Sequence, residues 1–309
     1  MLRRFLTTLQ QVRIDAATHV GIVYAAFCME VSMKLSRLIW LFVLAMAPAA
    51  LAQGTYSEID FPGAFSTYAV GIDKAGDVSG WFKENNGDIH GFLLRNGTYT
   101  RIDYPGTAEG TQLGAMNDLG QIVGVAGVTF IFDMNTGTFT DINSNLSPSA
   151  LNNSGVVVGQ VNTNGGLYGY VLKGTKGMVI EPPQTFFGMA AGISTSGDIV
   201  GYASGSSGNI NFEYSKGKYS LITIPNITSP VVYGINPAGT LVVGSYASGT
   251  SYAGFVYDGK TLTSLQYNGA DTVANTMNDS GQVVGIFGYD STNNIHGFVW
   301  TPRLKAAKK

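Results

Sequence analysis

Residues 71–80 read Gly71-Ile72-Asp73-Lys74-Ala75-Gly76-Asp77-Val78-Ser79-Gly80. The stretch joins an apolar pair, an Asx or Ser residue, two variable residues and a glycine to a short β-forming run and a second glycine. Five more copies of this phrase begin at Ala115, Ala150, Gly192, Gly234 and Thr276. Their turn glycines are spaced 44, 35, 42, 42 and 42 residues apart from Gly76 onward. The chain therefore contains six copies of a unit of about 41 residues.

Each copy has the pattern of four β-strands. The Asn-x-x-Gly tetrad favours a short turn, because Asx side chains bond to the nearby backbone and glycine accepts a positive φ. The flanking residues, such as those of Gln282-Val283-Val284, favour strands. A third run centres on an aromatic, as in His90-Gly91-Phe92, and a fourth follows a glycine turn, as in 97–106. Four strands in about 41 residues is the size of one propeller blade.

The two ends of the repeat region complement each other. The last copy stops after its third strand, at Trp300-Thr301-Pro302, and residues 54–63 closely match the fourth strand at 97–106. A ring whose last blade is completed by the N-terminal strand leaves no exposed first or last edge. An open solenoid would need polar caps at both ends, which the sequence lacks. The repeats therefore favour an all-β, six-bladed β-propeller, closed by the N-terminal strand, over a β-solenoid or a sandwich.

Small residues recur near the start of the first strand of each unit, at Ala69 and Gly71, Gly114 and Ala115, 190–192, and Ala274. Space is tightest where blades converge, so we expect this strand to be the innermost one.

Residues 33–52 have the features of a secretory signal peptide. Lys34 and Arg37 form a positive region, residues 38–47 are apolar, and Ala50-Leu51-Ala52 is a small-x-small cleavage site. The apolar run is about half the length needed to span a bilayer. We expect cleavage after Ala52, residues 1–32 to be a mis-called leader, residues 53–302 to be one propeller domain, and residues 303–309 to be a basic tail.

Composition excludes several classes of protein. The 309-residue chain has 41 glycines, 45% hydrophobic residues, 12% charged residues and a net charge of −2. This apolar content excludes intrinsic disorder, and so few charges argue against a nucleic-acid partner. The only cysteine, Cys28, precedes the cleavage site. We therefore expect a secreted or periplasmic monomer without disulfides, held together by its apolar core and without stable membrane insertion.

The repeats resemble the HAF-repeat family of bacterial extracellular proteins. The resemblance rests on the Gly-Ile-Asx-x-x-Gly-x-Val-x-Gly phrase, on His90-Gly91-Phe92 and His296-Gly297-Phe298, and on the Thr-x-Ile-Asp-x-Pro-Gly ending. It covers residues 54–302 and implies an exported repeat protein, without implying an activity. Histidine occurs only in the first and last copies, and Tyr168, Asn211, Ala253 and Thr129 are assigned to that place elsewhere.

Three sets of polar residues are candidates for chemistry. His90 and His296 recur at one repeat position and would lie in neighbouring blades, where a metal or acid–base pair is one interpretation and packing within the repeat is the other. Asp60 and Asp103 also recur, and aspartates on different blades could flank a sugar, although capping a turn is the ordinary explanation. The Asx residues of the turns suit calcium, but their place in a tight turn accounts for them. These are Asp73, Asn117, Asn152, Asn236 and Asn278.

Four aromatic residues follow the glycine that ends the second strand, at Trp81, Tyr202, Tyr246 and Phe287. Aromatic rings at blade edges can stack on sugars or hold a peptide, whereas packing between blades is the alternative. These four and the two histidines are the candidate ligand-binding residues. No catalytic motif, metal-ligand spacing or cofactor fingerprint occurs.

The sequence therefore predicts a secreted, non-catalytic propeller that binds a glycan or a protein and needs no cofactor. A hydrolase or lyase acting on polysaccharide and a structural cell-surface component are the alternatives.

Overall fold

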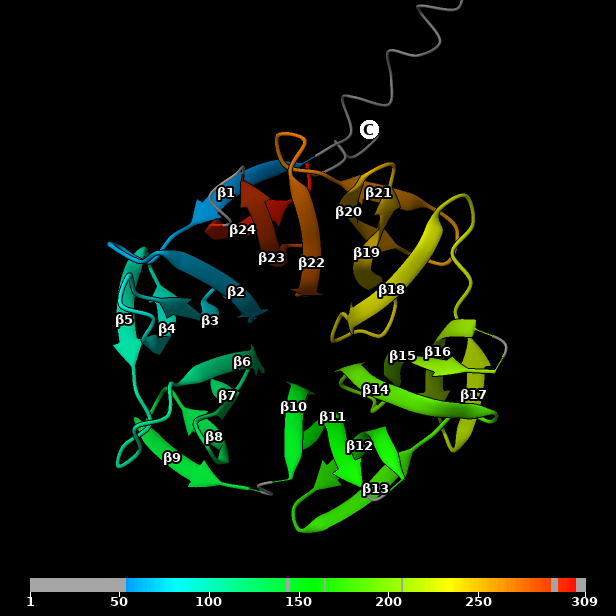
Figure 1. The fold of residues 1–309 in the computed structure, drawn as a ribbon, viewed down its shortest axis with the longest axis horizontal. Helices are drawn as coiled ribbons and strands as arrows, with labels where there is room; N and C mark the ends of the chain where they lie inside the picture. The colour runs from blue at the N-terminus through cyan, green and yellow to red at the C-terminus, as the bar shows by residue number, and fades with distance from the viewer. Residues whose placement is uncertain (1–53, 143–144, 164, 207, 290–293, 304–309) are drawn as a thin grey trace, which may run out of the picture. The chain divides into compact units, whose positions relative to one another are not determined.

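The computed structural model describes residues 54–142, 145–163, 165–206, 208–289 and 294–303. These residues form six four-stranded antiparallel sheets arranged in a ring, so the predicted six-bladed propeller is confirmed (Figure 1). The expected signal peptide, its cleavage site, the leader and most of the basic tail lie outside the described residues. Within the described residues, no helix is long and apolar enough to cross a membrane.

Each blade has one strand at the centre of the ring and one at the rim (Figure 1). The innermost strands are β2 (Ser66–Ile72), β6 (Gln112–Met116), β10 (Leu146–Leu151), β14 (Thr185–Ile193), β18 (Thr228–Ile235) and β22 (Asp271–Met277). The second strands are β3 (Val78–Lys83), β7 (Gln121–Val125), β11 (Val156–Thr163), β15 (Ile199–Gly205), β19 (Val242–Ser248) and β23 (Val283–Tyr289). The third strands are β4 (Ile89–Arg95), β8 (Thr129–Asp133), β12 (Gly166–Lys173), β16 (Gly208–Ser215), β20 (Ser251–Tyr257) and β24 (Asn294–Thr301). The outermost strands are β5 (Thr98–Ile102), β9 (Thr138–Asp141), β13 (Lys176–Ile180), β17 (Lys218–Leu221), β21 (Leu262–Leu265) and β1 (Thr55–Ile59).

The N-terminal strand closes the ring as predicted. β1 pairs antiparallel with β24, in a register that runs from Thr55 opposite Thr301 to Ile59 opposite Gly297. Tyr56 on this strand packs against Phe298 at 5.5 Å between ring centroids, and Phe61 just beyond it stacks on Phe82 at 3.7 Å. The strand therefore completes the sixth blade and also packs against the first.

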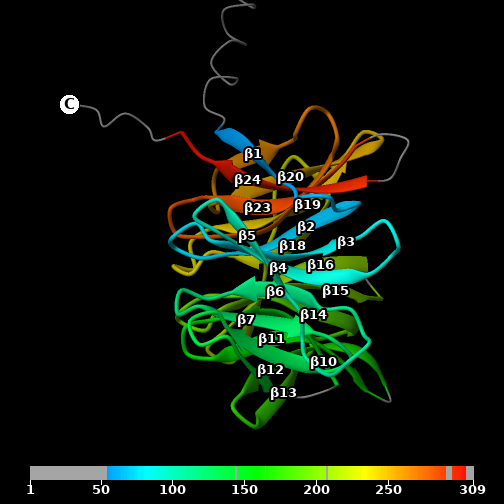
Figure 2. The ribbon, with the colours of Figure 1, turned by 90° about the vertical axis from the view of Figure 1, so that its left-hand side faces the viewer.

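The core lies between neighbouring blades. The aromatic residue of the third strand is fully buried in five blades, at Phe92, Phe130, Phe212, Phe255 and Phe298. Figure 2 shows the first and second blades from the rim, with β2 to β5 above β6 and β7. Burial of large side chains between sheets supplies most of the stability that a chain without disulfides can have.

The glycine that ends the repeated phrase is required by close packing. A Cβ atom at Gly244 would collide with the carbonyl oxygen of Val231 on the inner strand and with the ring of Phe255. The equivalent glycines at 80, 159, 201 and 285 meet the inner strand in the same way. Glycine recurs here because the inner strand and the buried aromatic ring leave no room for a side chain.

This packing gives a first prediction. Gly244→Ala is expected to destabilise the fold by about 1–3 kcal/mol, the usual range for an overpacked core. Gly188→Ala is the matched control, because a Cβ there would have its nearest neighbour at an ordinary 3.7 Å. Chemical denaturation of both variants measures the difference. Equal stability of the two would show that Gly244 tolerates a side chain.

Candidate functional site: the central channel

The six inner strands surround a cavity of about 360 Å3 on the axis of the ring. Its lining comes from all six blades and is mainly apolar, with hydroxyl and amide groups between the apolar side chains. Among the described residues that line it, Asp118 is the one charged side chain, and it lies at the end where the inner strands finish. The cavity has the size and the composition of a small-molecule site.

Every inner strand carries a β-bulge where it lines the channel. In the first blade, Ala69 pairs with Gly80 and Gly71 with Ser79, so that Val70 is the extra residue. Register shifts occur at the same place in the other five sheets. A bulge turns a side chain away from the regular pleat. The residues at this position, here called the bulge ring, all line the channel and are Val70, Gly114, Ser149, Ala191, Tyr233 and Asn275.

Two residues further along each strand, a second set of side chains lines the channel. The side chains there, here called the apolar ring, all line the channel and are Ile72, Met116, Leu151, Ile193, Ile235 and Met277. Each is no more than 7% exposed. In the bulge ring, by contrast, only Ala191 is buried and the other five residues are half-buried.

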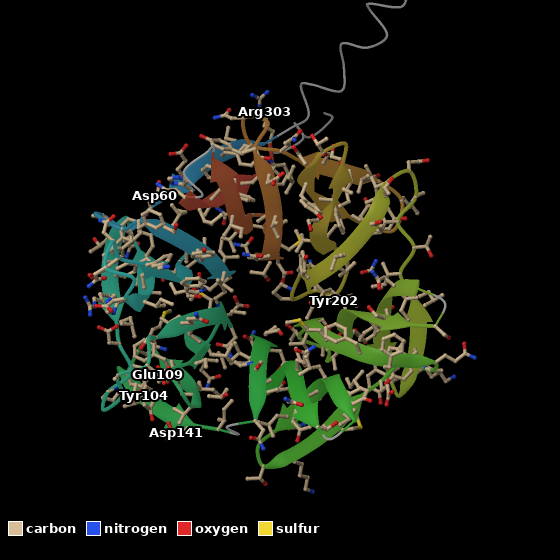
Figure 3. All side chains as sticks on the ribbon, in the orientation of Figure 1. Asp60, Tyr104, Glu109, Asp141, Tyr202 and Arg303 are labelled. Atoms are coloured by element: carbon tan, nitrogen blue, oxygen red, sulfur yellow. The ribbon has the colours of Figure 1, made fainter. Side chains whose placement is uncertain are left out.

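Aromatic residues gather at the end of the channel where the inner strands begin, here called the mouth face. Tyr68 lines the channel and stacks on Trp81, with 3.7 Å between centroids and 10° between planes. On the opposite side of the ring, Tyr202 meets Tyr233 edge-on at 6.0 Å and donates a hydrogen bond to Sδ of Met189. Figure 3 places Tyr202 beside the centre of the ring. Burial raises the pKa of Tyr68 and of Tyr202, which keeps both phenols neutral.

The other two predicted aromatics lie elsewhere. Phe287 is fully buried and stacks on His296 at 5.3 Å, and the Tyr246 hydroxyl lies 2.9 Å from Oγ of Ser264 on the outermost strand. Trp81 and Tyr202 stand one residue after the second-strand glycine, whereas Tyr246 and Phe287 stand two after it. Successive strand residues point to opposite faces, so the four aromatics do not form one surface.

The two histidines each pair with an aspartate of the same blade. His90 Nδ1 lies 2.8 Å from Asp103 Oδ1, and His296 Nδ1 lies 2.9 Å from Asp60 Oδ1. In each case the histidine is on the third strand and the aspartate follows the outermost strand. The recurrence of both residue types in the same two copies was a signal in the sequence for this pairing. The sequence alignment of Asn211 and Thr129 with the histidines was wrong by one residue, because the strand registers place both at the repeat position of Gly91.

One cluster on the first blade combines possible metal ligands. Donor atoms of Glu84, Asp88 and His90 all lie within 4.8 Å of one another. Arg101 Nη1 lies 3.2 Å from Glu84 Oε1, and Arg101 Nε lies 2.6 Å from Asp103 Oδ2. The guanidinium thus already pairs with two carboxylates around His90, and the cluster is explained as a surface ion-pair network.

The Asx residues of the turns link neighbouring blades. Oδ1 of Asn152 accepts hydrogen bonds from the backbone of Ser154 and Val156, which caps its own turn. Its Nδ2 also donates to the carbonyl oxygen of Ser194 in the next blade. Similar bonds join all six blades in a closed circuit, here called the turn belt. They run from Asn278 to Asp73, Lys74 to Asp118, Asn117 to Asn152, Asn152 to Ser194, Thr195 to Pro237 and Asn236 to Asp279.

Comparison with known proteins supports the fold alone. No protein-family model and no curated protein sequence matches the chain. TolB from Acinetobacter baumannii superimposes with a TM-score of 0.52 and 10% identity. The match covers 74% of this chain and 64% of the TolB chain. A protein named as a gluconolactonase superimposes with a TM-score of 0.52 and 11% identity, over 85% of this chain and 99% of its own. At these identities the likeness shows a shared propeller fold.

Proposed function

We propose that this protein is a non-catalytic binding propeller that takes a neutral glycan at the mouth face of its central channel. The observation that carries the proposal is the lining, which combines aromatic rings with amide and hydroxyl groups and, from the mouth to the apolar ring, contains no charged side chain among the described residues. Sugar rings present apolar C–H faces and hydroxyl groups at once. An aromatic wall with a few polar groups complements both features.

The uncharged lining selects the charge of the ligand. A carboxylate or phosphate that entered the channel would leave water without gaining an ionic partner there, and such a transfer is costly. A neutral sugar residue exchanges its water for amides and hydroxyls at little net loss. The channel therefore favours neutral glycans over uronates and sulfated or phosphorylated polymers.

The placement of carboxylates supports binding over hydrolysis. Glycosidases use two carboxyl groups roughly 5–10 Å apart on either side of the scissile bond. Asp60 and Asp103 pair with histidines beside the outermost strands and do not belong to the channel lining. Asp118 does line the channel, but its carboxylate accepts hydrogen bonds from Lys74 N at 2.9 Å and Asn153 Nδ2 at 3.3 Å. The oxygens of Asp118 are thus already engaged in hydrogen bonds with residues of the neighbouring turns.

We also propose that the protein is exported. The support is the signal-peptide pattern of residues 33–52 together with the resemblance to HAF-repeat proteins. The secreted protein should begin at Gln53 and be a monomer. N-terminal sequencing of the product recovered outside the cytoplasm tests the start at Gln53, and recovery of residues 1–32 would contradict it.

Calorimetric titration with neutral oligosaccharides tests the binding function. A panel of gluco-, manno-, xylo- and galacto-oligosaccharides should contain at least one binder. Tyr233→Ala and Tyr68→Ala should each weaken its binding at least tenfold, because each removes an aromatic ring from the channel lining. Tyr252→Ala is the control, because this side chain is 55% exposed and does not line the channel.

Three results would contradict the proposal. The first is an absence of binding across the panel, and the second is equal weakening by the Tyr252 control. The third is turnover of any oligosaccharide that is abolished by Asp103→Asn, which would favour the hydrolase or lyase alternative.

A further inference from the structure

We propose that the ligand is a glycan polymer whose chain lies across the mouth face, from the first blade to the fourth, with an interior stretch of the chain over the channel. This inference rests on the proposed glycan binding and adds the length and the direction of the bound glycan. It follows from aromatic residues that recur at two positions of the repeat, in the first and fourth blades only.

The first of these positions directly follows the glycine that ends the repeated phrase. Aromatic residues occur there as Trp81 in the first blade and Tyr202 in the fourth. The other four blades have aliphatic or polar side chains at this position, namely Val125, Gln160, Ser245 and Ile286. Each aromatic meets a ring that lines the channel, since Trp81 stacks on Tyr68 and Tyr202 meets Tyr233 edge-on. Aromatic pairs therefore flank the channel at two of the six blades.

The second position is at the mouth-face end of the inner strand, outside the channel lining. Phe65 and Phe186 each stand four residues before the inner-strand alanine that pairs with the glycine of the phrase. The same count in the other four blades gives Glu109, Ser144, Thr228 and Ala270. Phe65 is 38% exposed and Phe186 is 61% exposed. Single exposed apolar residues are ordinary, but this pair is equivalent and recurs with the inner aromatics, which indicates a shared role.

The backbone holds both exposed rings in place. The amide of Phe65 donates a hydrogen bond to the end of β3 at 2.8 Å. Phe186 is an extra residue in β14, because the pairing with β15 shifts by one between Thr185 and Phe187. Gln184, two residues before it, has a left-handed φ of 66°, a strained conformation of the kind that clusters at ligand sites. A bulge re-aims a side chain, so the fourth blade has a local device that turns Phe186 outward.

The two sets of aromatics define a line across the ring. The first and fourth of six blades lie opposite each other, as Figure 1 shows for β2 and β14. Aromatic faces on both sides of the channel suit the apolar faces of successive sugar residues. A chain that lies along this line therefore binds by residues in its interior and needs no free end.

The outer rings lie too far apart for a short ligand. Phe65 and Phe186 each stand three residues before a residue that lines the channel, Tyr68 and Met189, which is roughly 10 Å of strand. A disaccharide bound at the channel cannot reach both outer rings, whereas a longer chain can. The contribution of these rings should thus depend on the length of the glycan.

Chain length gives the first test, with the oligosaccharide series that binds the protein. Affinity measured by calorimetric titration should rise at least tenfold from the disaccharide to the octasaccharide, because the added residues reach the outer rings. Reduction of the octasaccharide to its alditol should change the affinity less than twofold, because interior residues make the contacts.

Substitutions at the two ends of the line give the second test. Phe65→Ala and Phe186→Ala should each weaken the octasaccharide at least fivefold and change the disaccharide less than twofold. Phe186→Trp should keep the octasaccharide affinity, because it keeps an aromatic face. Tyr252→Ala is the matched control and should change neither, because this side chain is 55% exposed but belongs to the fifth blade, off the line. Thermal melts check the fold, and a leucine variant replaces any alanine variant that does not fold.

The outcomes separate this inference from the proposed function. Three results would overturn the crossing chain while binding at the channel stands: no rise of affinity with length, an unchanged octasaccharide affinity after loss of either outer ring, or equal weakening by Tyr252→Ala. If no oligosaccharide binds, the proposed function and this inference fail together.

Discussion

Deleting residues 54–62 is expected to lower the melting temperature by roughly 10–20 °C or to make the protein aggregate. The deletion removes β1 and leaves β24 with an unpaired edge. Ile59 is only 6% exposed, and Tyr56 and Phe61 pack against Phe298 and Phe82. The deletion therefore also exposes the apolar side chains that these three residues cover. At about 1.5–3 kcal/mol for each large apolar side chain, the loss is on the order of 5 kcal/mol. This is a large fraction of the stability of a typical domain.

Deletion of residues 305–309 is the control for this experiment. That segment follows the last strand, and its loss should change the melting temperature by no more than about 2 °C. Differential scanning calorimetry of both deletions, with light scattering to detect aggregates, makes the comparison. If the two deletions are equally harmless, the N-terminal strand is dispensable and the closure of the ring does not stabilise the protein.

Asn152→Asp is expected to destabilise the protein by about 3–5 kcal/mol at pH 7, the range for an uncompensated buried charge. Asn152 is 5% exposed, and its Nδ2 donates to Ser194 O at 3.0 Å. A carboxylate in its place would keep the turn cap but would face a carbonyl oxygen without a proton to share. Burial next to that oxygen raises the pKa of the new carboxyl group in the folded state.

The sign of the pH dependence follows from this raised pKa. The new carboxyl group binds a proton more tightly in the folded protein than in the unfolded chain, so the destabilisation is greatest above the folded pKa and decreases as the pH falls through it. Asn152→Ala, which has no titrating group, should instead show a loss that changes little with pH. Urea unfolding of both variants between pH 4 and pH 8 tests the difference.

Asp73→Asn is the matched control at the equivalent position. Oδ1 of Asp73 accepts hydrogen bonds from the backbone of Ala75 and Asp77, and an asparagine can do the same. Burial and the Asp73 charge both raise the pKa of Asp77, so removal of the Asp73 charge should leave stability equal or slightly higher. If Asp73→Asn lowers the stability as much as Asn152→Asp does, the hydrogen bond that Asn152 Nδ2 donates to the next blade is not the cause of the destabilisation.

The local signals in the sequence predicted the blades well. Turn glycines, β-branched runs and the recurring aromatic each depend on neighbours a few residues away, and the strands lie where these signals place them. Closure was also predictable, because residues 54–63 resemble the fourth strand of a repeat, whereas the last repeat has only its first three strands. The small residues of the first strand correctly indicated the innermost position.

The features that form the candidate site depend on neighbours far apart in the sequence. A bulge is defined by the register between two strands, so nothing in the residues around Val70 or Tyr233 marks them as extra residues. The second role of Asn152 depends on a carbonyl oxygen 42 residues away. The aromatics were grouped by their distance from a glycine, and one residue of difference divides Trp81 and Tyr202 at the mouth from the buried Phe287.

The pairing of β1 with β24 also has a consequence for how the chain acquires its fold. Each of the first five blades is built from strands that are consecutive in the chain, so it can form from local contacts soon after it is synthesised. The sixth blade joins Thr55 to Thr301, and such distant pairing is slow to form. During translation the first strand has to wait, unpaired, until the last repeat has left the ribosome. The rate-limiting event in folding is therefore expected to be the docking of the two chain ends.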